Sequence, residues 1–206
     1  MTKIKICGIH RMEDIAYVNE ARPEYIGFVF APSKRQVTKE QARNLKKQLR
    51  PEIEVVGVFV NAKPEAIEYL CKMHIIDMVQ LHGDENDAYI RELRKRVSNP
   101  IIRAVRVQSK EQVLQAEELS SEYLLLDTYV ANEYGGSGQE LQLQLLPKLQ
   151  KPYFLAGGLT PQNVAKKISI VYPYAVDISS GVETNGVKDF NKIKEFIYNV
   201  RKGAVK

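Results

Sequence analysis

The chain has 206 residues, a formal net charge of +5 and 44% hydrophobic residues, a composition typical of a globular protein with one full core. No apolar run is long enough to cross a bilayer, and the scattered basic residues form no stripe of the kind that binds nucleic acid. The first residues enter an apolar segment without the layout of a signal peptide, and two cysteines indicate no disulfide framework. We therefore expect a single cytoplasmic domain over residues 1–206, with neither membrane nor nucleic-acid partners.

Short apolar segments alternate with helical patterns along the whole chain. The predicted strands cover residues 4–7, 25–30, 55–60, 78–81, 101–107, 124–127, 153–156 and 175–179. They are apolar throughout rather than alternating, as expected of parallel strands that are covered on both faces.

Helical spacing fills the segments between these strands, as at Ala42, Leu45 and Leu49. Residues 38–41 and 109–112 read as capping boxes, and Thr160-Pro161 reads as an N-cap followed by proline at the first helical position. The sixth helix, over residues 141–149, has the poorest periodicity. Eight strand–helix units predict an α/β fold, a closed (β/α)₈ TIM barrel, with an open doubly wound sheet as the alternative.

The loops after the seventh and eighth predicted strands are rich in glycine. Gly157 and Gly158 follow residues 153–156, and Ser180 and Gly181 follow residues 175–179. Glycine lets backbone N–H groups approach an anion closely, and the loops after these two strands commonly bind phosphate in TIM barrels. The sequence therefore predicts a phosphate site at these loops.

Two reactive side chains lie at the ends of predicted strands. Cys7 closes the first strand and precedes Gly8, whereas Asp127 closes the sixth. Side chains at the carboxyl ends of parallel strands face one mouth, so we expect the two to meet. A thiol acts as a base only as the thiolate, and a carboxyl acts as an acid only if it keeps its proton, which burial favours. By contrast, Cys71 lies on the apolar face of a predicted helix and fits inert packing.

Other polar residues follow the remaining strands. Gln80 and His82 close the fourth, and His82 is either a proton carrier or a structural hydrogen-bonding residue. Arg35 follows the second strand, where it either binds a carboxylate bidentately or faces solvent. The sequence contains no HxH, HExxH or CxxC, so a metal site is not expected.

Taken in order, the motifs resemble the phosphoribosylanthranilate isomerase family over nearly the whole chain. The segments that carry the resemblance are residues 5–8, 27–30, 33–37, 56–60, 80–83, 126–127, 135–138, 155–159 and 177–183. The chain departs from the family pattern where Leu141-Gln142-Leu143 replaces Phe-Asp-Trp, and where Lys34 replaces a proline between serine and arginine. Neither departure touches Cys7 or Asp127.

The resemblance implies a TIM-barrel isomerase of tryptophan biosynthesis that needs no metal or organic cofactor. It implies an Amadori rearrangement of N-(5′-phosphoribosyl)anthranilate, with Asp127 as general acid and Cys7 as general base. Arg35 would hold the anthranilate carboxylate, and amides near Gly157, Gly158, Ser180 and Gly181 would hold the phosphate. Gln80, His82, Asp177 and Glu183 are expected to orient these groups, in a monomer or a homodimer.

Three other readings stay open at this point. A related barrel isomerase of histidine biosynthesis would carry an aspartate at the end of its first strand, where this chain has Cys7. A phosphopentose epimerase would carry a metal-binding pattern of histidine and aspartate that is missing here. A non-catalytic module that binds a phosphorylated sugar is the remaining possibility.

Overall fold

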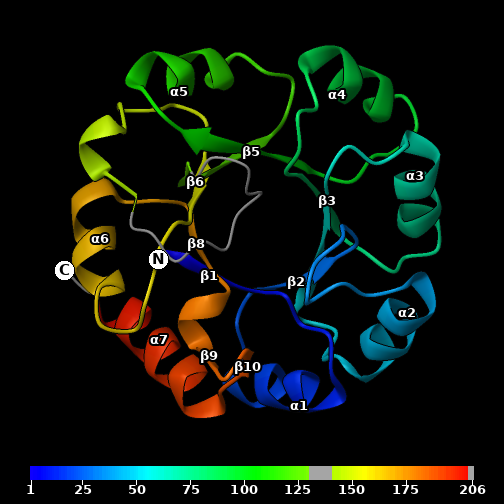
Figure 1. Cartoon of the computed structure of the whole chain (residues 1–206), viewed down its shortest axis with the longest axis vertical. Helices are drawn as coiled ribbons and strands as arrows, with labels where there is room; N and C mark the ends of the chain where they lie inside the picture. The colour runs from blue at the N-terminus through cyan, green and yellow to red at the C-terminus, as the bar shows by residue number, and fades with distance from the viewer. Residues whose placement is uncertain (130–140, 204–206) are drawn as a thin grey trace.

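Eight parallel strands, hydrogen-bonded in chain order, close into a barrel that is ringed by helices (Figure 1). The computed structural model describes residues 1–129 and 141–203. The strands are β1 (Lys3–Cys7), β2 (Tyr25–Val29), β3 (Glu54–Phe59), β4 (Met78–Leu81), β5 (Ile101–Val107), β6 (Tyr123–Thr128), β7 (Tyr153–Leu155) and β8 (Ala175–Ile178). The predicted TIM barrel is therefore confirmed, and the open sheet is rejected because β1 pairs with β8.

The barrel is covered by α1 (Met12–Ala21), α2 (Lys39–Gln48), α3 (Pro64–Lys72), α4 (Asp87–Arg94), α5 (Lys110–Glu117), α6 (Val164–Val171) and α7 (Phe190–Gly203). None of the helices in the described part of the chain combines the length and the apolar character that crossing a membrane requires.

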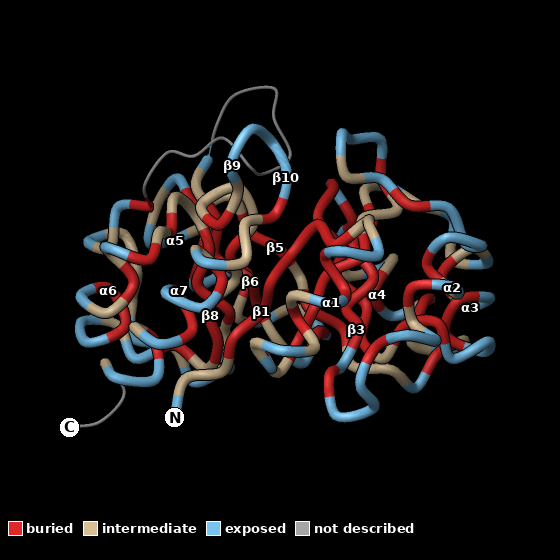
Figure 2. Tube along the Cα trace, turned by 90° about the horizontal axis from the view of Figure 1, so that it is seen from below, coloured by how far each residue is buried: buried red, intermediate tan, exposed pale blue. Residues whose placement is uncertain are grey.

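Successive side chains of each strand point to opposite faces of the sheet, so the buried apolar residues form two separate clusters. On β1, Ile4 and Ile6 belong to the apolar layer between the barrel and its helices, so Lys5 and Cys7 point into the barrel. A second cluster fills the interior with residues such as Phe154. Figure 2 shows the buried strands at the centre and exposed residues on the outer helices. Polar groups inside a barrel are consequently desolvated, which strengthens the interactions between them.

The structure confirms the three predicted helix starts to different degrees. Thr38 and Gln41 form the predicted capping box of α2. Ser109 accepts from the backbone of Gln112 as predicted, but the Gln112 side chain accepts from Gln108 instead of closing the box. At residues 160–161 the prediction holds in part. The Thr160 hydroxyl accepts from the N–H of Asn163, and the Asn163 side chain accepts from the N–H of Thr160, which is the pattern of a capping residue. The α-helix itself begins at Val164 and not at Pro161, after one intervening turn.

The predicted sixth helix is wrong. Residues 141–149 contain only a short 3₁₀ helix, η1 (Leu143–Leu145). Its leucines pack against the main core without helical periodicity, and Pro147 lacks the N–H that an α-helix would need. The predicted glycine loop at residues 135–138 lies outside the described residues.

A short hairpin that the sequence prediction lacks follows β8. It joins β9 (Glu183–Thr184) to β10 (Val187–Lys188), with the 3₁₀ helix η2 (Ser180–Val182) before it. Asn185 and Gly186 at its tip both have positive φ, of 53° and 79°, which is the signature of a type I′ turn and of an Asn-Gly pair. The hairpin carries Glu183 and Lys188 toward the mouth of the barrel.

Candidate active site

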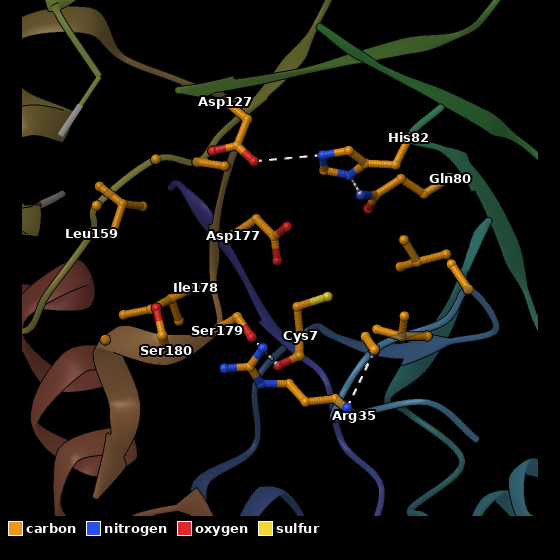
Figure 3. A pocket seen from close by; sticks show the side chains of 18 of the residues that line it. Cys7, Arg35, Gln80, His82, Asp127, Leu159, Asp177, Ile178, Ser179 and Ser180 are labelled. Carbon is orange, nitrogen blue, oxygen red and sulfur yellow. Dashed lines mark hydrogen bonds and ion pairs between the residues drawn. The ribbon is translucent and has the colours of Figure 1, made fainter. Parts of the chain in front are cut away.

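A cavity of about 510 Å³ opens at the carboxyl ends of the strands. Of the eleven residues predicted for the site, Glu183 does not line the cavity and bonds to Arg35 instead. The other ten line it, and Figure 3 shows the polar ones around one hollow. These residues are Cys7, Arg35, Gln80, His82, Asp127, Gly157, Gly158, Asp177, Ser180 and Gly181. Cys7 and Gly181, which are 174 positions apart in the sequence, thus line one pocket.

The Cys7 thiol lies over the neighbouring strand, opposite Gly27 in the β1–β2 register. A Cβ atom at position 27 would lie 2.6 Å from the Cys7 sulfur, closer than atoms can pack. The missing side chain of Gly27 therefore makes the room in which the thiol faces the cavity.

Charged groups of both signs surround that thiol. Burial raises the pKa of Cys7, and the negative charge of Asp177 adds to this, whereas the ammonium groups of Lys5 and Lys188 act in the opposite direction. The net direction is upward, so the Cys7 thiol keeps its proton more firmly than an exposed cysteine does. Lys5 and Lys188 are therefore the groups that favour the thiolate at this position.

Asp127 lies at the end of β6, facing His82 across the cavity (Figure 3). Its Oδ1 accepts a 2.8 Å hydrogen bond from the backbone N–H of Thr128, and its Oδ2 lies 3.5 Å from Nε2 of His82. The other ring nitrogen of His82, Nδ1, lies 2.8 Å from Nε2 of Gln80. His82 is therefore hydrogen-bonded to Gln80, while its Nε2 has no hydrogen-bond partner among the described residues and faces Asp127 at ion-pair distance.

Lys5 is a fully buried member of the site that sequence reasoning missed. Its Nζ donates to Oδ2 of Asp177 and to Oε1 of Gln80, both at 2.9 Å. Burial alone would lower the pKa of Lys5, but Asp177 and Cys7 outweigh it and the net direction is upward. The signal available in the sequence was a lysine two positions before Cys7, on the same face of an apolar strand.

Arg35 already holds a carboxylate in this structure. Its Nε and Nη2 donate to the two carboxylate oxygens of Glu183, each at 2.7 Å, and Lys188 donates to the same carboxylate at 2.6 Å. Burial would raise the pKa of Glu183, but Arg35 and Lys188 lower it overall. One edge of the guanidinium is thus occupied from within the protein, which the sequence did not reveal.

The glycine loops pack directly against each other and their neighbours. Gly157 has φ +81°, and a Cβ there would lie 2.3 Å from Oγ1 of Thr128. A Cβ at Gly181 would lie 2.0 Å from the carbonyl oxygen of Leu159. Both positions require glycine, because a side chain would separate the loop after β7 from β6 and from the loop after β8.

A closed βα barrel with a thiol, a carboxyl and two glycine-bearing loops at one mouth defines a TIM-barrel enzyme. The family model described as "N-(5'phosphoribosyl)anthranilate (PRA) isomerase" matches residues 4–199. The chain belongs to this family, and it is accordingly an aldose–ketose isomerase. No group of three or more histidine, cysteine or acidic side chains in the described ranges is placed to hold a metal ion.

Individual relatives agree with the family match. The N-(5′-phosphoribosyl)anthranilate isomerase of Endomicrobium trichonymphae is 47% identical over 201 residues, covering 98% of this chain and 99% of the relative. The crystal structure of phosphoribosyl anthranilate isomerase from Thermotoga maritima superposes with a TM-score of 0.86 at 36% identity, over 98% of this chain and 100% of that one. A phosphoribosyl anthranilate isomerase in complex with reduced 1-(o-carboxyphenylamino)-1-deoxyribulose 5-phosphate matches with a TM-score of 0.82, at 36% identity and the same coverage.

Proposed function

We propose that this chain converts N-(5′-phosphoribosyl)anthranilate into 1-(o-carboxyphenylamino)-1-deoxyribulose 5-phosphate, with Asp127 as general acid and Cys7 as general base. The observation that carries the proposal is that both groups, from β6 and β1, line one cavity. The related isomerase that was crystallised with the reduced product supports the same chemistry. Among the readings left open by the sequence, family membership favours this one.

The first step is ring opening. Asp127 gives its proton to the ribose ring oxygen as the bond from C1′ to that oxygen breaks, and the nitrogen lone pair forms the C=N bond of a Schiff base. The carboxylate left behind accepts from the backbone N–H of Thr128 and faces His82. Both contacts favour the charged product of this proton transfer.

The second step removes a proton from C2′. The Cys7 thiolate takes that proton, the C=N electrons move to nitrogen, and the enolamine tautomerises to the ketone. A buried thiolate is costly, and the ammonium groups of Lys5 and Lys188 offset part of that cost. General acid and base steps of this kind each contribute about 10²–10⁴-fold.

The remaining cavity residues would hold the substrate at both ends. Gly157, Gly158, Ser180 and Gly181 line the cavity, and their backbone amides would bind the phosphate. Arg35 would take the anthranilate carboxylate through Nη1, since Glu183 occupies its other edge. Holding both ends places the ribose between the acid and the base and lowers the entropic part of the barrier.

Asp177 is proposed to accept a hydrogen bond from a hydroxyl group of the ribose. Its Oδ2 is bonded to Lys5, whereas its Oδ1 is buried and lacks a hydrogen-bond partner within residues 1–129 and 141–203. Because Asp177 lines the cavity, a substrate hydroxyl is the group that would satisfy this oxygen.

Complementation tests the proposal. The chain should restore growth without tryptophan to a bacterium that lacks its own isomerase, and the Cys7→Ala/Asp127→Asn double variant, expressed to the same level, should not. Failure of the folded wild-type chain, or equal growth with the double variant, would contradict the proposal.

A further inference from the structure

Five polar side chains, four of them buried, form a row along the wall of the cavity, from Asp127 through His82, Gln80 and Lys5 to Asp177. The successive separations are 3.5, 2.8, 2.9 and 2.9 Å. Figure 3 shows the Asp127–His82–Gln80 part of the row at the cavity wall. Each member comes from a barrel strand or its end, so the row is held by the most rigid part of the fold.

Lys5 determines which way the Gln80 amide points. A lysine ammonium has only donors, so the atom of Gln80 that faces it at 2.9 Å has to be the carbonyl oxygen. The opposite orientation would set the amide NH₂ against the ammonium. The NH₂ of Gln80 is consequently directed at His82.

The orientation of Gln80 in turn limits His82. The amide NH₂ donates to Nδ1 of the imidazole at 2.8 Å, so Nδ1 has to carry a lone pair. A neutral imidazole then bears its proton on Nε2, the atom that faces Asp127. We propose that Lys5, acting through Gln80, locks His82 in the Nε2–H tautomer and so presents an N–H to the carboxyl group of Asp127.

The locked tautomer has a consequence for catalysis, which rests on the acid role proposed for Asp127. With the proton on Nε2, His82 stabilises the carboxylate that remains after Asp127 has given its proton away. The other tautomer would set a lone pair against that carboxylate and oppose the transfer. The charge of Lys5 also favours the thiolate of Cys7, so one buried ammonium group acts on both reacting side chains, and it does so as a positioning residue.

Nitrogen-15 NMR of the imidazole rings tests the proposal directly. The chain has three histidines, so their ring signals are readily assigned with single His→Gln variants. At about pH 8, where histidine is largely neutral, the signals of His82 should be those of a protonated Nε2 and an unprotonated Nδ1. Exposed His74 is the internal reference for an unrestrained ring. An unprotonated Nε2 with a protonated Nδ1 in His82 of the wild-type chain would overturn the proposal, whatever the activity assays give.

The Gln80→Glu variant supplies the second measurement. Its carboxylate still accepts from Lys5, but it turns the group facing Nδ1 of His82 into an acceptor. The His82 ring should therefore gain a proton on Nδ1, while the His74 signals stay unchanged. An unaltered His82 spectrum in this folded variant would contradict the locking role of the row.

Kinetics of the same variant separate this inference from the function on which it rests. With wild-type activity present, Gln80→Glu should lower kcat about 10- to 100-fold, part of the contribution of a general acid, and change KM less. A changed tautomer with unchanged kcat would remove the catalytic role of the row but leave the acid role of Asp127 standing. Absence of activity in the wild-type chain would instead reject the proposed function.

Discussion

Glu183 and Arg35 form a bidentate ion pair across the mouth of the barrel, with two hydrogen bonds of 2.7 Å. Glu183 belongs to the β9–β10 hairpin that follows β8, and Arg35 lies after β2. The Glu183 side chain is 6% exposed and the Arg35 side chain 24%. The pair thus ties two loops on either side of β1 and leaves only part of the guanidinium free for a ligand.

Replacing Glu183 tests what this pair contributes to stability. Its pKa is lowered in the folded state, so its contribution is present above the unfolded value of about 4.3 and is lost as the pH falls through the folded value. Glu183→Gln should lower the free energy of unfolding by about 1–3 kcal/mol at pH 7, as for hydrogen bonds to charged groups. Urea unfolding of both chains should show the difference narrowing below about pH 4.

The matched control is Glu52→Gln. Glu52 pairs with Arg50 on the surface, with both side chains about half exposed, so its removal should change stability little at any pH. Equal effects of the two variants at pH 7 would mean that the Glu183 pair is no stronger than a surface pair.

Cys7→Ala should lower kcat by about 10²–10⁴-fold, the contribution of a general base, while the reduced product still binds. Cys71→Ala is the control, because Cys71 is buried in α3 and faces the helical layer of the core. That variant should lose stability by cavity formation and keep kcat. Steady-state kinetics and unfolding curves on both variants check this, and near-normal kcat in Cys7→Ala would exclude the thiol as base.

The pH dependence of kcat/KM should reflect the environment of Cys7. Burial raises the pKa of this thiol while Lys188 opposes the shift, so activity should rise with pH through a limb above the ordinary thiol value of about 8.5. Lys188→Met removes one opposing charge and should move the limb to higher pH. Lys194→Met, at an exposed position of α7, should leave it in place. A limb that moves downward in Lys188→Met would contradict this account.

Asp127→Asn keeps the size of the side chain and an acceptor for the backbone N–H of Thr128, but it has no acidic proton to give. We expect kcat to fall by about 10²–10⁴-fold and KM to change only a few-fold. If steady-state kinetics show a loss confined to KM, Asp127 binds substrate and another group supplies the proton.

Gly181→Ala should weaken phosphate binding. The new methyl group would lie 2.0 Å from the carbonyl oxygen of Leu159, so the loops after β7 and β8 would have to move apart. KM should rise about tenfold or more, equivalent to at least about 1.4 kcal/mol, and inorganic phosphate should become a weaker inhibitor. Gly203→Ala at the end of α7, where a Cβ would meet no atom closer than 3.1 Å, controls for general effects of an added methyl group and should leave KM unchanged.

Local sequence patterns were sufficient for the fold and for the composition of the pocket. Apolar runs and helical spacing each depend on neighbouring residues, so the eight strands and seven of the eight predicted helices could be ordered along the chain, whereas the helix predicted over residues 141–149 does not form. Once the strands are parallel, residues at their carboxyl ends face one mouth, which is why Cys7 and Asp127 could be expected to line the same cavity. The Asn185-Gly186 pair carried an equally local signal for the hairpin, and the prediction did not use it.

The sequence by itself determined which residues reach the mouth of the barrel, whereas the tertiary structure decided which of them bond to one another. Lys5 and Asp177 are 172 positions apart, and Arg35 and Glu183 are 148 apart. Such pairings follow from the closure of the sheet and from the inward direction of alternate side chains. Their electrostatic effects arise because closure removes water from the interior, and no pattern of neighbouring residues encodes that.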